Sequence, residues 1–188
     1  MKKFKVLILS IIMVMLVVWY YQYLSNKTDS SKKEEESKEI DILVNKNLNA
    51  KYPETPREVV KLYNRIMLCY YNDKCTNEQL VGLTAQARTL YDQELLDKNP
   101  YDEYFKRLIE EIDQYKSDNR KITSCMLAGS REVEYYTIKK EKYASIQCIY
   151  YSKGDKGTIK SDETYVLRKD DKGKWKILYW KLNGEEDE

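Results

Sequence analysis

The stretch Arg120-Lys121-Ile122-Thr123-Ser124-Cys125-Met126-Leu127 marks the point where the hydrophobic period of the chain changes from helical to two. Before it, apolar residues recur at helical spacing, and after it they alternate with polar residues. Alternation returns in segments around residues 133–138, 144–150, 164–168 and 175–182, and glycine-containing turns precede the last two. We therefore expect about five antiparallel strands that follow a group of helices.

Three helix starts precede the strands. Thr55-Pro56-Arg57-Glu58 and Thr76-Asn77-Glu78-Gln79 have the pattern of a capping box, and Asn99-Pro100 precedes an acidic first turn. Each start is followed by an apolar stripe at helical spacing. The stripes are Val59, Tyr63, Ile66, Met67 and Tyr70; Leu80, Leu83, Ala87, Leu90 and Leu95; and Tyr101, Tyr104, Phe105, Leu108 and Ile112. The pattern predicts an α+β fold, with three helices packed on one face of a curved antiparallel sheet.

The N-terminal region carries no charge from Val6 to Asn26, and three lysines precede this run. A helix over the run would be roughly 30 Å long, which matches the hydrocarbon core of a bilayer. A cleaved signal peptide needs small residues at its end, whereas this run contains Trp19-Tyr20-Tyr21; a lipoprotein signal needs a cysteine, and the first is Cys69. We therefore predict a transmembrane helix with the lipid bilayer as partner through residues 6–26. The predicted location is the cell membrane, single-pass, with a cytoplasmic N-terminus and an extracytoplasmic C-terminal domain.

These patterns divide the chain into four regions. Residues 1–25 hold the lysines and the anchor, residues 26–54 a flexible tether, residues 55–183 the α+β domain, and residues 184–188 an acidic tail. Within the tether, Ile40-Asp41-Ile42-Leu43-Val44 is too apolar for a linker. We expect it to dock on the domain, and the alternative is a strand that pairs with a partner.

The charge balance argues against nucleic acid as a partner. The chain has 33 Lys and Arg and 31 Asp and Glu, for a formal net charge of +2. Without the three lysines that precede Val6, the remainder has a net charge of −1. Because nucleic-acid binding is dominated by neutralisation of phosphates, a nearly neutral domain is not expected to bind it.

The order of elements resembles the nuclear transport factor 2-like (cystatin-like) superfamily. The resemblance covers about Thr55 to Leu182 and includes the last strand, Gly173-Lys174-Trp175-Lys176-Ile177-Leu178. It implies a cone-like sheet with a pocket at its wide end. One departure is that Ala128-Gly129-Ser130 leaves no room for the short helix that many members insert. The stretch Tyr52 to Val60, with the anchor, also resembles an uncharacterised family of membrane-anchored Gram-positive bacterial proteins, which implies location and fold but no activity.

The chain has no histidine, which excludes Ser-His-Asp and Cys-His catalysis and histidine metal sites. A cone-fold enzyme would need an acid–tyrosine pair instead. The residues that we expect to line a ligand-binding pocket are Tyr63, Tyr135 and Tyr165, and the acids on strands are Glu134, Asp162 and Glu163. The alternative is that the acids face solvent and the tyrosines belong to the core or its rim.

The four cysteines, Cys69, Cys75, Cys125 and Cys148, have two interpretations. Outside the cell an even number permits disulfides, and Cys125 and Cys148 are on strands that can be neighbours. The favoured interpretation is partly buried thiols, because cysteine packs as a small apolar group. No C-x₂-C pair and no glycine-rich phosphate loop is present, so we expect neither a metal nor a cofactor.

Tyrosine doublets on strands place one ring on each face of the sheet. Tyr136 and Tyr151 are therefore expected to leave aromatic surface on the outer face, where an envelope protein, a glycan or a second copy can bind. The leading hypothesis is a membrane-tethered extracytoplasmic binding module, with enzymatic activity less favoured. The alternative is a small-molecule enzyme of the isomerase or dehydratase kind, which a buried acid within hydrogen-bond reach of a tyrosine would favour.

Overall fold

We analysed the protein as a computed structural model, which describes residues 13–23, 35, 37–72 and 75–184. The chain divides into two compact units, Met1–Glu39 and Ile40–Glu188. In the first unit the structure describes helical residues 13–23, 35 and 37–39, the last of which continue into the second unit. All the other elements belong to the second unit.

The structure contradicts the predicted transmembrane helix and the single-pass location at the cell membrane that depended on it. Among the residues described, no helix combines the length and the apolar character needed to cross a membrane. Residues 6–12 and 24–26 of the predicted span lie outside the described residues, as do residues 27–34 and 36 of the predicted tether. The prediction was wrong because it took the lack of charge as sufficient. A span also needs a helix of sufficient length and apolar character.

The two capping boxes form as their sequences indicate. In helix α2 (Pro56–Asn72), the Glu58 amide donates to Thr55 Oγ1 and the Thr55 amide donates to Glu58 Oε2, both at 3.2 Å. In helix α3 (Asn77–Thr89), Thr76 and Gln79 make the same reciprocal pair. Each box satisfies two donors that a helix start leaves without intrahelical partners. These two starts therefore fix where α2 and α3 begin.

The second predicted helix is divided in two by Tyr91 and Asp92. The Asp92 amide donates to the Ile177 carbonyl at 2.8 Å, and the Ile177 amide donates to the Leu90 carbonyl at 2.8 Å. Asp92 then accepts from the Glu94 amide and begins the short helix α4 (Gln93–Lys98), which contains Leu95. Helix α5 (Tyr101–Ser117) follows, without a side-chain cap at Pro100. The domain thus has an additional short helix where the chain pairs with the last strand.

The sheet has five antiparallel strands, as expected. They are β1 (Lys121–Leu127), β2 (Glu134–Ile138), β3 (Glu141–Gly154), β4 (Gly157–Lys169) and β5 (Trp175–Leu182), in the order β1-β3-β4-β5. Strand β3 is long enough to pair with β4 on one edge and with both β1 and β2 on the other. The 3₁₀ helix η1 (Ser130–Glu132) lies between β1 and β2, so a three-residue helix does fit where the sequence analysis left no room for one.

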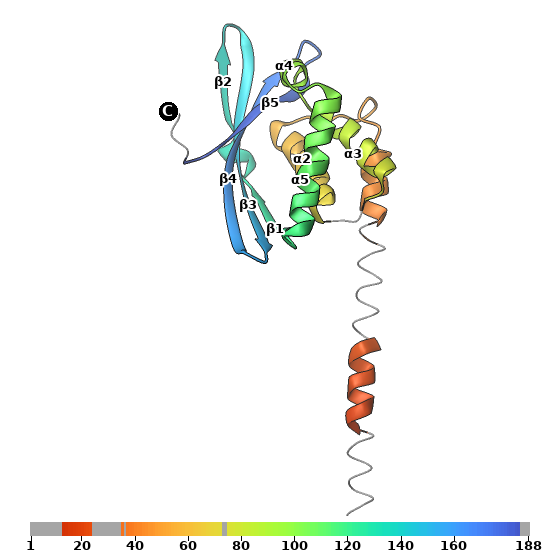
Figure 1. The fold of residues 1–188 in the computed structure, drawn as a ribbon. Helices are drawn as coiled ribbons and strands as arrows, with labels where there is room; N and C mark the ends of the chain where they lie inside the picture. Colours follow the sequence, from red (N-terminus) through yellow and green to blue (C-terminus); the bar gives the residue numbers. More distant parts are fainter. Residues whose placement is uncertain (1–12, 24–34, 36, 73–74, 185–188) are drawn as a thin grey trace, which may run out of the picture. The chain divides into compact units, whose positions relative to one another are not determined.

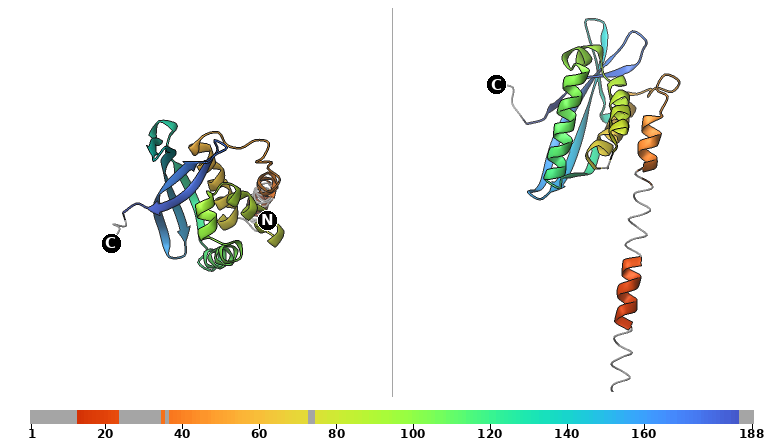
Figure 2. Two further views of the ribbon diagram at one scale, coloured as in Figure 1. Left: turned by 90° about the horizontal axis from the view of Figure 1, so that it is seen from above. Right: turned by 45° about the vertical axis from the view of Figure 1, so that its right-hand side comes forward.

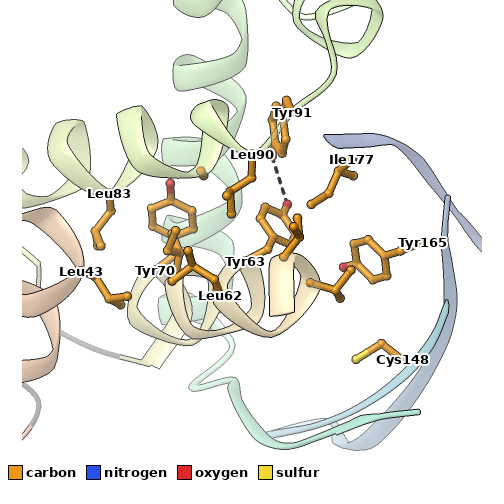
Figure 3. Close-up of a cluster of buried hydrophobic side chains, with 14 of the residues drawn as sticks. Leu43, Leu62, Tyr63, Tyr70, Leu83, Leu90, Tyr91, Cys148, Tyr165 and Ile177 are labelled. Carbon is orange, nitrogen blue, oxygen red and sulfur yellow. Dashed lines mark hydrogen bonds between the residues drawn. The ribbon is translucent and has the colours of Figure 1, made fainter. Parts of the chain in front are cut away.

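The helices cover one face of the twisted sheet and leave the other to solvent (Figures 1 and 2). The core lies between these layers, and its largest fully buried side chains include Tyr63, Tyr70 and Tyr165. Figure 3 shows how α2, α3 and the sheet contribute to it. The apolar segment Ile40 to Val44 is helical, and Ile40 and Leu43 are buried in the same core. This segment therefore packs on the domain instead of pairing as a strand.

Candidate functional site

A pocket of about 510 Å³ lies between the covered face of the sheet and helices α2 and α5. Seven tyrosines and one tryptophan dominate its lining, together with five aliphatic, three neutral polar and four charged residues. The lining residues are Tyr63, Met67, Tyr71, Tyr91, Leu95, Asn99, Tyr104, Arg107, Leu108, Glu111, Tyr115, Arg120, Ile122, Tyr150, Ser152, Ile159, Ser161, Glu163, Tyr165 and Trp180. Pockets of this size, mostly apolar with a few convergent polar groups, are typical small-molecule sites.

Two periodicities build this lining. Along β4, the pocket is lined by Ile159, Ser161, Glu163 and Tyr165, which share a face because side chains on a strand alternate. Along α5, Tyr104, Leu108, Glu111 and Tyr115 recur at helical spacing and face the sheet. The pocket is therefore enclosed by one strand face and one helix face that are remote in sequence.

Glu163 is the acid inside the pocket. Its carboxylate accepts from Tyr165 Oη at 3.1 Å and from Ser161 Oγ at 3.1 Å. Burial raises the pKa of Glu163, and these two hydrogen bonds oppose the rise. A carboxyl group in this environment holds its proton at higher pH than an exposed glutamate does, so it can donate or accept a hydrogen bond within the pocket.

Two short chains of hydroxyl groups line the walls. Tyr150 Oη hydrogen-bonds to Tyr165 Oη at 2.8 Å and donates to Asn64 Oδ1 at 2.5 Å. Tyr91 Oη donates to Tyr63 Oη at 3.1 Å and lies 3.1 Å from Tyr104 Oη (the Tyr63–Tyr91 pair is drawn in Figure 3). Burial raises the pKa of Tyr63, Tyr91 and Tyr165, so these phenols stay neutral. Because Tyr63 accepts from Tyr91, its own proton is left for another acceptor.

Trp180 contributes the largest aromatic surface of the pocket. Its ring centroid lies 5.8 Å from Tyr63, 6.1 Å from Tyr91 and 5.9 Å from Tyr165. The side chain is 37% exposed, whereas those three tyrosines are buried. Trp180 therefore lies at the boundary between the pocket and solvent, where a flat apolar ligand can stack on it.

The charged groups of the pocket other than Glu163 are held by neighbours at its rim. Arg107 Nη2 donates to Asn99 Oδ1 at 2.7 Å, and the Arg120 guanidinium lies 5.7 Å from the centre of the Tyr115 ring. Glu111 adds a carboxylate from α5. Arg120 is also paired with Asp118 at 3.8 Å, and the charges of Arg107 and Glu111 are opposite in sign. The rim therefore suits a ligand that is neutral or carries a single negative charge.

The structure places the predicted site residues in two different environments. Tyr63 and Tyr165 line the pocket, on α2 and β4 respectively. Tyr135 does not line it: its side chain is 59% exposed on β2, and its ring lies 5.8 Å from Trp175. Strand β2 pairs with the first half of β3, away from the pocket residues Tyr150 and Ser152 on its second half.

Of the three acids considered from the sequence, the pocket contains Glu163 alone. Asp162 accepts hydrogen bonds from Gln147 at 2.7 Å and from Asn183 at 2.6 Å, and these bonds lower its pKa. Glu134 is exposed and accepts from Ser145 Oγ at 3.2 Å. Both therefore have the solvent-facing role that was the alternative interpretation.

Several pocket residues were not singled out from the sequence for this site, above all Tyr150, Trp180 and the α5 face. Tyr104, Leu108 and Ile112 were expected in the core stripe, and the spacing of Tyr104, Glu111 and Tyr115 was the available signal for α5. Within the described part of the chain, no cluster of three His, Cys, Asp or Glu residues is arranged to hold a metal ion. The site therefore offers aromatic stacking, hydrogen bonds, the half-buried acid Glu163 and the rim acid Glu111.

Comparison with known proteins gives a family and one structural likeness. Residues 1–180 match the model of a family described as "Domain of unknown function (DUF6715)". No curated protein matches the chain. The crystal structure of the helical cell shape determining protein Pgp2 from Campylobacter jejuni is similar, with a TM-score of 0.35 and 15% identity. The match covers 58% of this chain and 44% of that one, so this chain spans less than half the length of that structure.

Proposed function

The chain belongs to the DUF6715 family, and from its pocket we propose that the domain binds a small organic molecule between α5 and the sheet. The observation that carries the proposal is a 510 Å³ pocket with eight aromatic side chains around one half-buried acid, Glu163. A pocket that combines apolar walls, convergent polar groups and a perturbed pKa is a typical binding site of a domain. The likeness of the sequence to cone-shaped domains with an internal pocket also supports the proposal.

The lining indicates the chemistry of the ligand. Trp180 and the tyrosine rings favour a flat ring system, on which they can stack or pack edge to face. Glu163 and the Tyr63 hydroxyl are suited to a hydroxyl or carbonyl group on that ring, because each can complete a hydrogen bond inside the pocket. We therefore propose a ring compound of modest size with one or two oxygen substituents.

The fluorescent probe anilinonaphthalene sulfonate tests the pocket, because it combines fused rings with a single negative charge. We expect one probe per chain, with enhanced emission. Ser161→Phe should fill the pocket and weaken binding by about tenfold or more, the equivalent of about 1.4 kcal/mol. The matched control is Lys160→Phe, which places the same ring on the opposite face of β4 and should leave the affinity unchanged.

Equal binding by Ser161→Phe and wild type would overturn the proposal. Ser152→Leu is an independent variant that fills the same pocket from β3. Circular dichroism of each variant separates a filled pocket from an unfolded domain. Probe binding that is lost in Lys160→Phe and retained in Ser161→Phe would place the dye on the outer face of the sheet instead.

The contact between Glu163 and Tyr165 supports a second candidate, proton transfer of the isomerase kind. In that reaction the Glu163 carboxylate would take a proton from the carbon beside a carbonyl group and return it to a distant carbon of the conjugated system. A tyrosine hydroxyl would donate to the carbonyl oxygen as negative charge develops there. Tyr63, whose proton is not used by Tyr91, is the suitable donor.

A β,γ-unsaturated cyclic ketone is the probe for this reaction, because its conjugated isomer absorbs in the ultraviolet. Wild type should convert it faster than buffer does, and Glu163→Gln should abolish the excess rate. Asp162→Asn is the matched control on the opposite face of β4 and should retain activity. Wild type that is no faster than buffer would eliminate the catalytic candidate and leave the binding proposal intact.

A further inference from the structure

Behind the pocket, Cys125 and Cys148 bring two thiols into contact on the covered face of the sheet. Their Sγ atoms are 3.3 Å apart. Cys125 lies on β1 opposite Tyr150, and Cys148 lies on β3 opposite Leu127, so the two cysteines are diagonal neighbours on paired strands. Both are thiols in this structure. A disulfide has an S–S distance of about 2.05 Å, so the two sulfur atoms need to approach by little more than one ångström.

Asn64 fixes the position of both sulfur atoms. Its Nδ2 atom donates to Cys125 Sγ at 2.9 Å and to Cys148 Sγ at 3.3 Å. Asn64 is buried on α2, and Tyr150 Oη donates to its Oδ1 atom. Helix and sheet therefore hold the two thiols together in the folded state, which removes most of the search that a disulfide otherwise requires.

The two thiols differ in access and in acidity. Cys148 is fully buried, whereas Cys125 is half-buried and has a route to solvent. The hydrogen bond between them lowers the pKa of Cys148 and raises that of Cys125, because the Cys125 thiol then donates to the Cys148 sulfur. The two are thus complementary: one cysteine can be reached from outside, and its neighbour more readily becomes the nucleophilic thiolate.

We propose that Cys125 and Cys148 are a site of reversible oxidation to a disulfide by a small-molecule disulfide such as oxidised glutathione. The Cys125 thiol passes its proton to the Cys148 sulfur as the Cys125 sulfur attacks one sulfur of the reagent, which forms a mixed disulfide on Cys125. The glutathione thiolate that leaves takes up this proton, so that Cys148 is again a thiolate. The Cys148 thiolate then attacks Cys125 Sγ and releases the second. The two protein thiols lose two electrons, the reagent gains them, and the two released thiolates take up the two protons.

Oxidation at this site reaches the pocket through Asn64. Formation of the disulfide shifts both acceptors of the Asn64 amide, and the other end of that amide holds Tyr150. Tyr150 Oη in turn lies 2.8 Å from Tyr165 Oη, which donates to Glu163. The two thiols are therefore connected to the acid of the pocket by a continuous chain of polar contacts, and the near-ultraviolet signal of the tyrosines should change on oxidation.

The experiment is equilibration of the full chain in glutathione buffers of increasing oxidised fraction, followed by alkylation of thiols and peptide mapping. We expect a peptide that links Cys125 to Cys148, with the mass of two hydrogens lost, and full recovery of both thiols on reduction. Cys75→Ser is the matched control and should leave this link unchanged. In the Cys148→Ser variant, the reaction should stop at a mixed disulfide on Cys125, and the change in near-ultraviolet circular dichroism should be absent.

Three outcomes would overturn the proposal. The first is no linked peptide at any glutathione ratio. The second is persistent glutathione on Cys125 of the wild type, which would show that Cys148 does not resolve the mixed disulfide. The third is a link between Cys69 and Cys75 with Cys125 and Cys148 unmodified. If Cys148→Ser fails to fold, Cys148→Ala repeats the test with a small apolar side chain in the same position.

Discussion

Asp162 and Glu163 are consecutive residues of β4, yet the two faces of the sheet give them opposite properties. Asp162 lies on the outer face with its side chain 24% exposed, and it accepts hydrogen bonds from Gln147 and Asn183, which lower its pKa. Glu163 lines the pocket beside Tyr165, and burial raises its pKa. The same contrast holds for tyrosines: Tyr165 is buried in the hydroxyl network, and Tyr179 on β5 is 45% exposed.

For these neighbours on β4, the face of the sheet on which a side chain lies sets its environment. Side chains on the outer face meet solvent, so their interactions contribute little to stability. Side chains on the covered face lose water and must find partners there, so each hydrogen bond is costly to remove. Pairs of variants that make the same change on the two faces therefore test this contrast.

The largest difference should be between Tyr165→Ala and Tyr179→Ala. Tyr165 is 1% exposed and packs against Tyr63 and Trp180, so its truncation should lower the free energy of unfolding by about 3–5 kcal/mol. Tyr179→Ala should cost about 0.5 kcal/mol or less. Urea denaturation monitored by circular dichroism measures both. Similar losses for the two variants would remove the basis of the contrast.

A smaller difference should separate two amides, Asn64 and Gln147. Asn64→Ala removes the partner of two thiols and of Tyr150, and it should lower the free energy of unfolding by about 1–3 kcal/mol. Gln147→Ala removes one exposed contact to Asp162 and should change stability by about 0.5 kcal/mol or less. The same denaturation experiment compares them, and a near-neutral Asn64→Ala would show that water replaces its contacts.

The outer face should still show one measurable contact, between Tyr136 and Tyr143. The two residues are directly paired across β2 and β3, and their rings stack with centroids 5.5 Å apart. A double-mutant cycle with Tyr136→Ser and Tyr143→Ser should give a coupling energy of about 0.2–1 kcal/mol. A coupling energy clearly above this range would contradict the assignment of this pair to a solvated surface.

The smallest expected effect concerns how the free energy of unfolding depends on pH, for which Glu163 and Asp162 should act in opposite directions. Because the folded-state pKa of Glu163 is raised above its ordinary 4.5, its contribution is present below that pH and is lost as the pH rises through the folded-state value. Because that of Asp162 is lowered below 3.8, its contribution is present above that pH and is lost as the pH falls. Relative to Glu163→Gln, wild type should therefore lose stability as the pH rises from about 4 to neutrality.

Relative to Asp162→Asn, wild type should lose stability in the opposite direction, on acidification. Urea midpoints of the three proteins across the acidic range give both comparisons. The two differences should have slopes of opposite sign. Slopes of the same sign would mean that Glu163 and Asp162 share one environment, which is incompatible with the pocket described above.

Local patterns in the sequence were sufficient for the elements that depend on neighbours in the chain. The capping boxes at Thr55 and Thr76 begin helices, and the alternation after Arg120 becomes five strands. The break at Tyr91 was not predicted, because it depends on hydrogen bonds to Ile177 at the other end of the chain. The membrane helix was wrong for a different reason: the lack of charge was taken as sufficient, and no helix among the described residues combines the length and the apolar character of a span.

The candidate site was predictable to the same extent. The alternation of β4 places Glu163 and Tyr165 on one face, and the stripe of α2 places Tyr63 toward the core, so these three follow from period alone. Tyr135 follows the same rule and yet lies outside the pocket, because parity fixes the face and not the position along the sheet. The contributions of α5 and of Trp180 depend on how helix and sheet pack together.

The hairpin of β3 and β4 also has a consequence for the order of folding. It closes through the two turn residues Asp155 and Lys156, and its pairing runs from Gly154–Gly157 to Tyr143–Arg168. Residue pairs near such a turn form at a low entropic cost of loop closure. Strand β1 must close a much longer loop before it can pair with β3. We therefore expect the β3–β4 hairpin to form first and the rest of the sheet to pair with it. The contact between Cys125 and Cys148 should form late, when β1 pairs with β3.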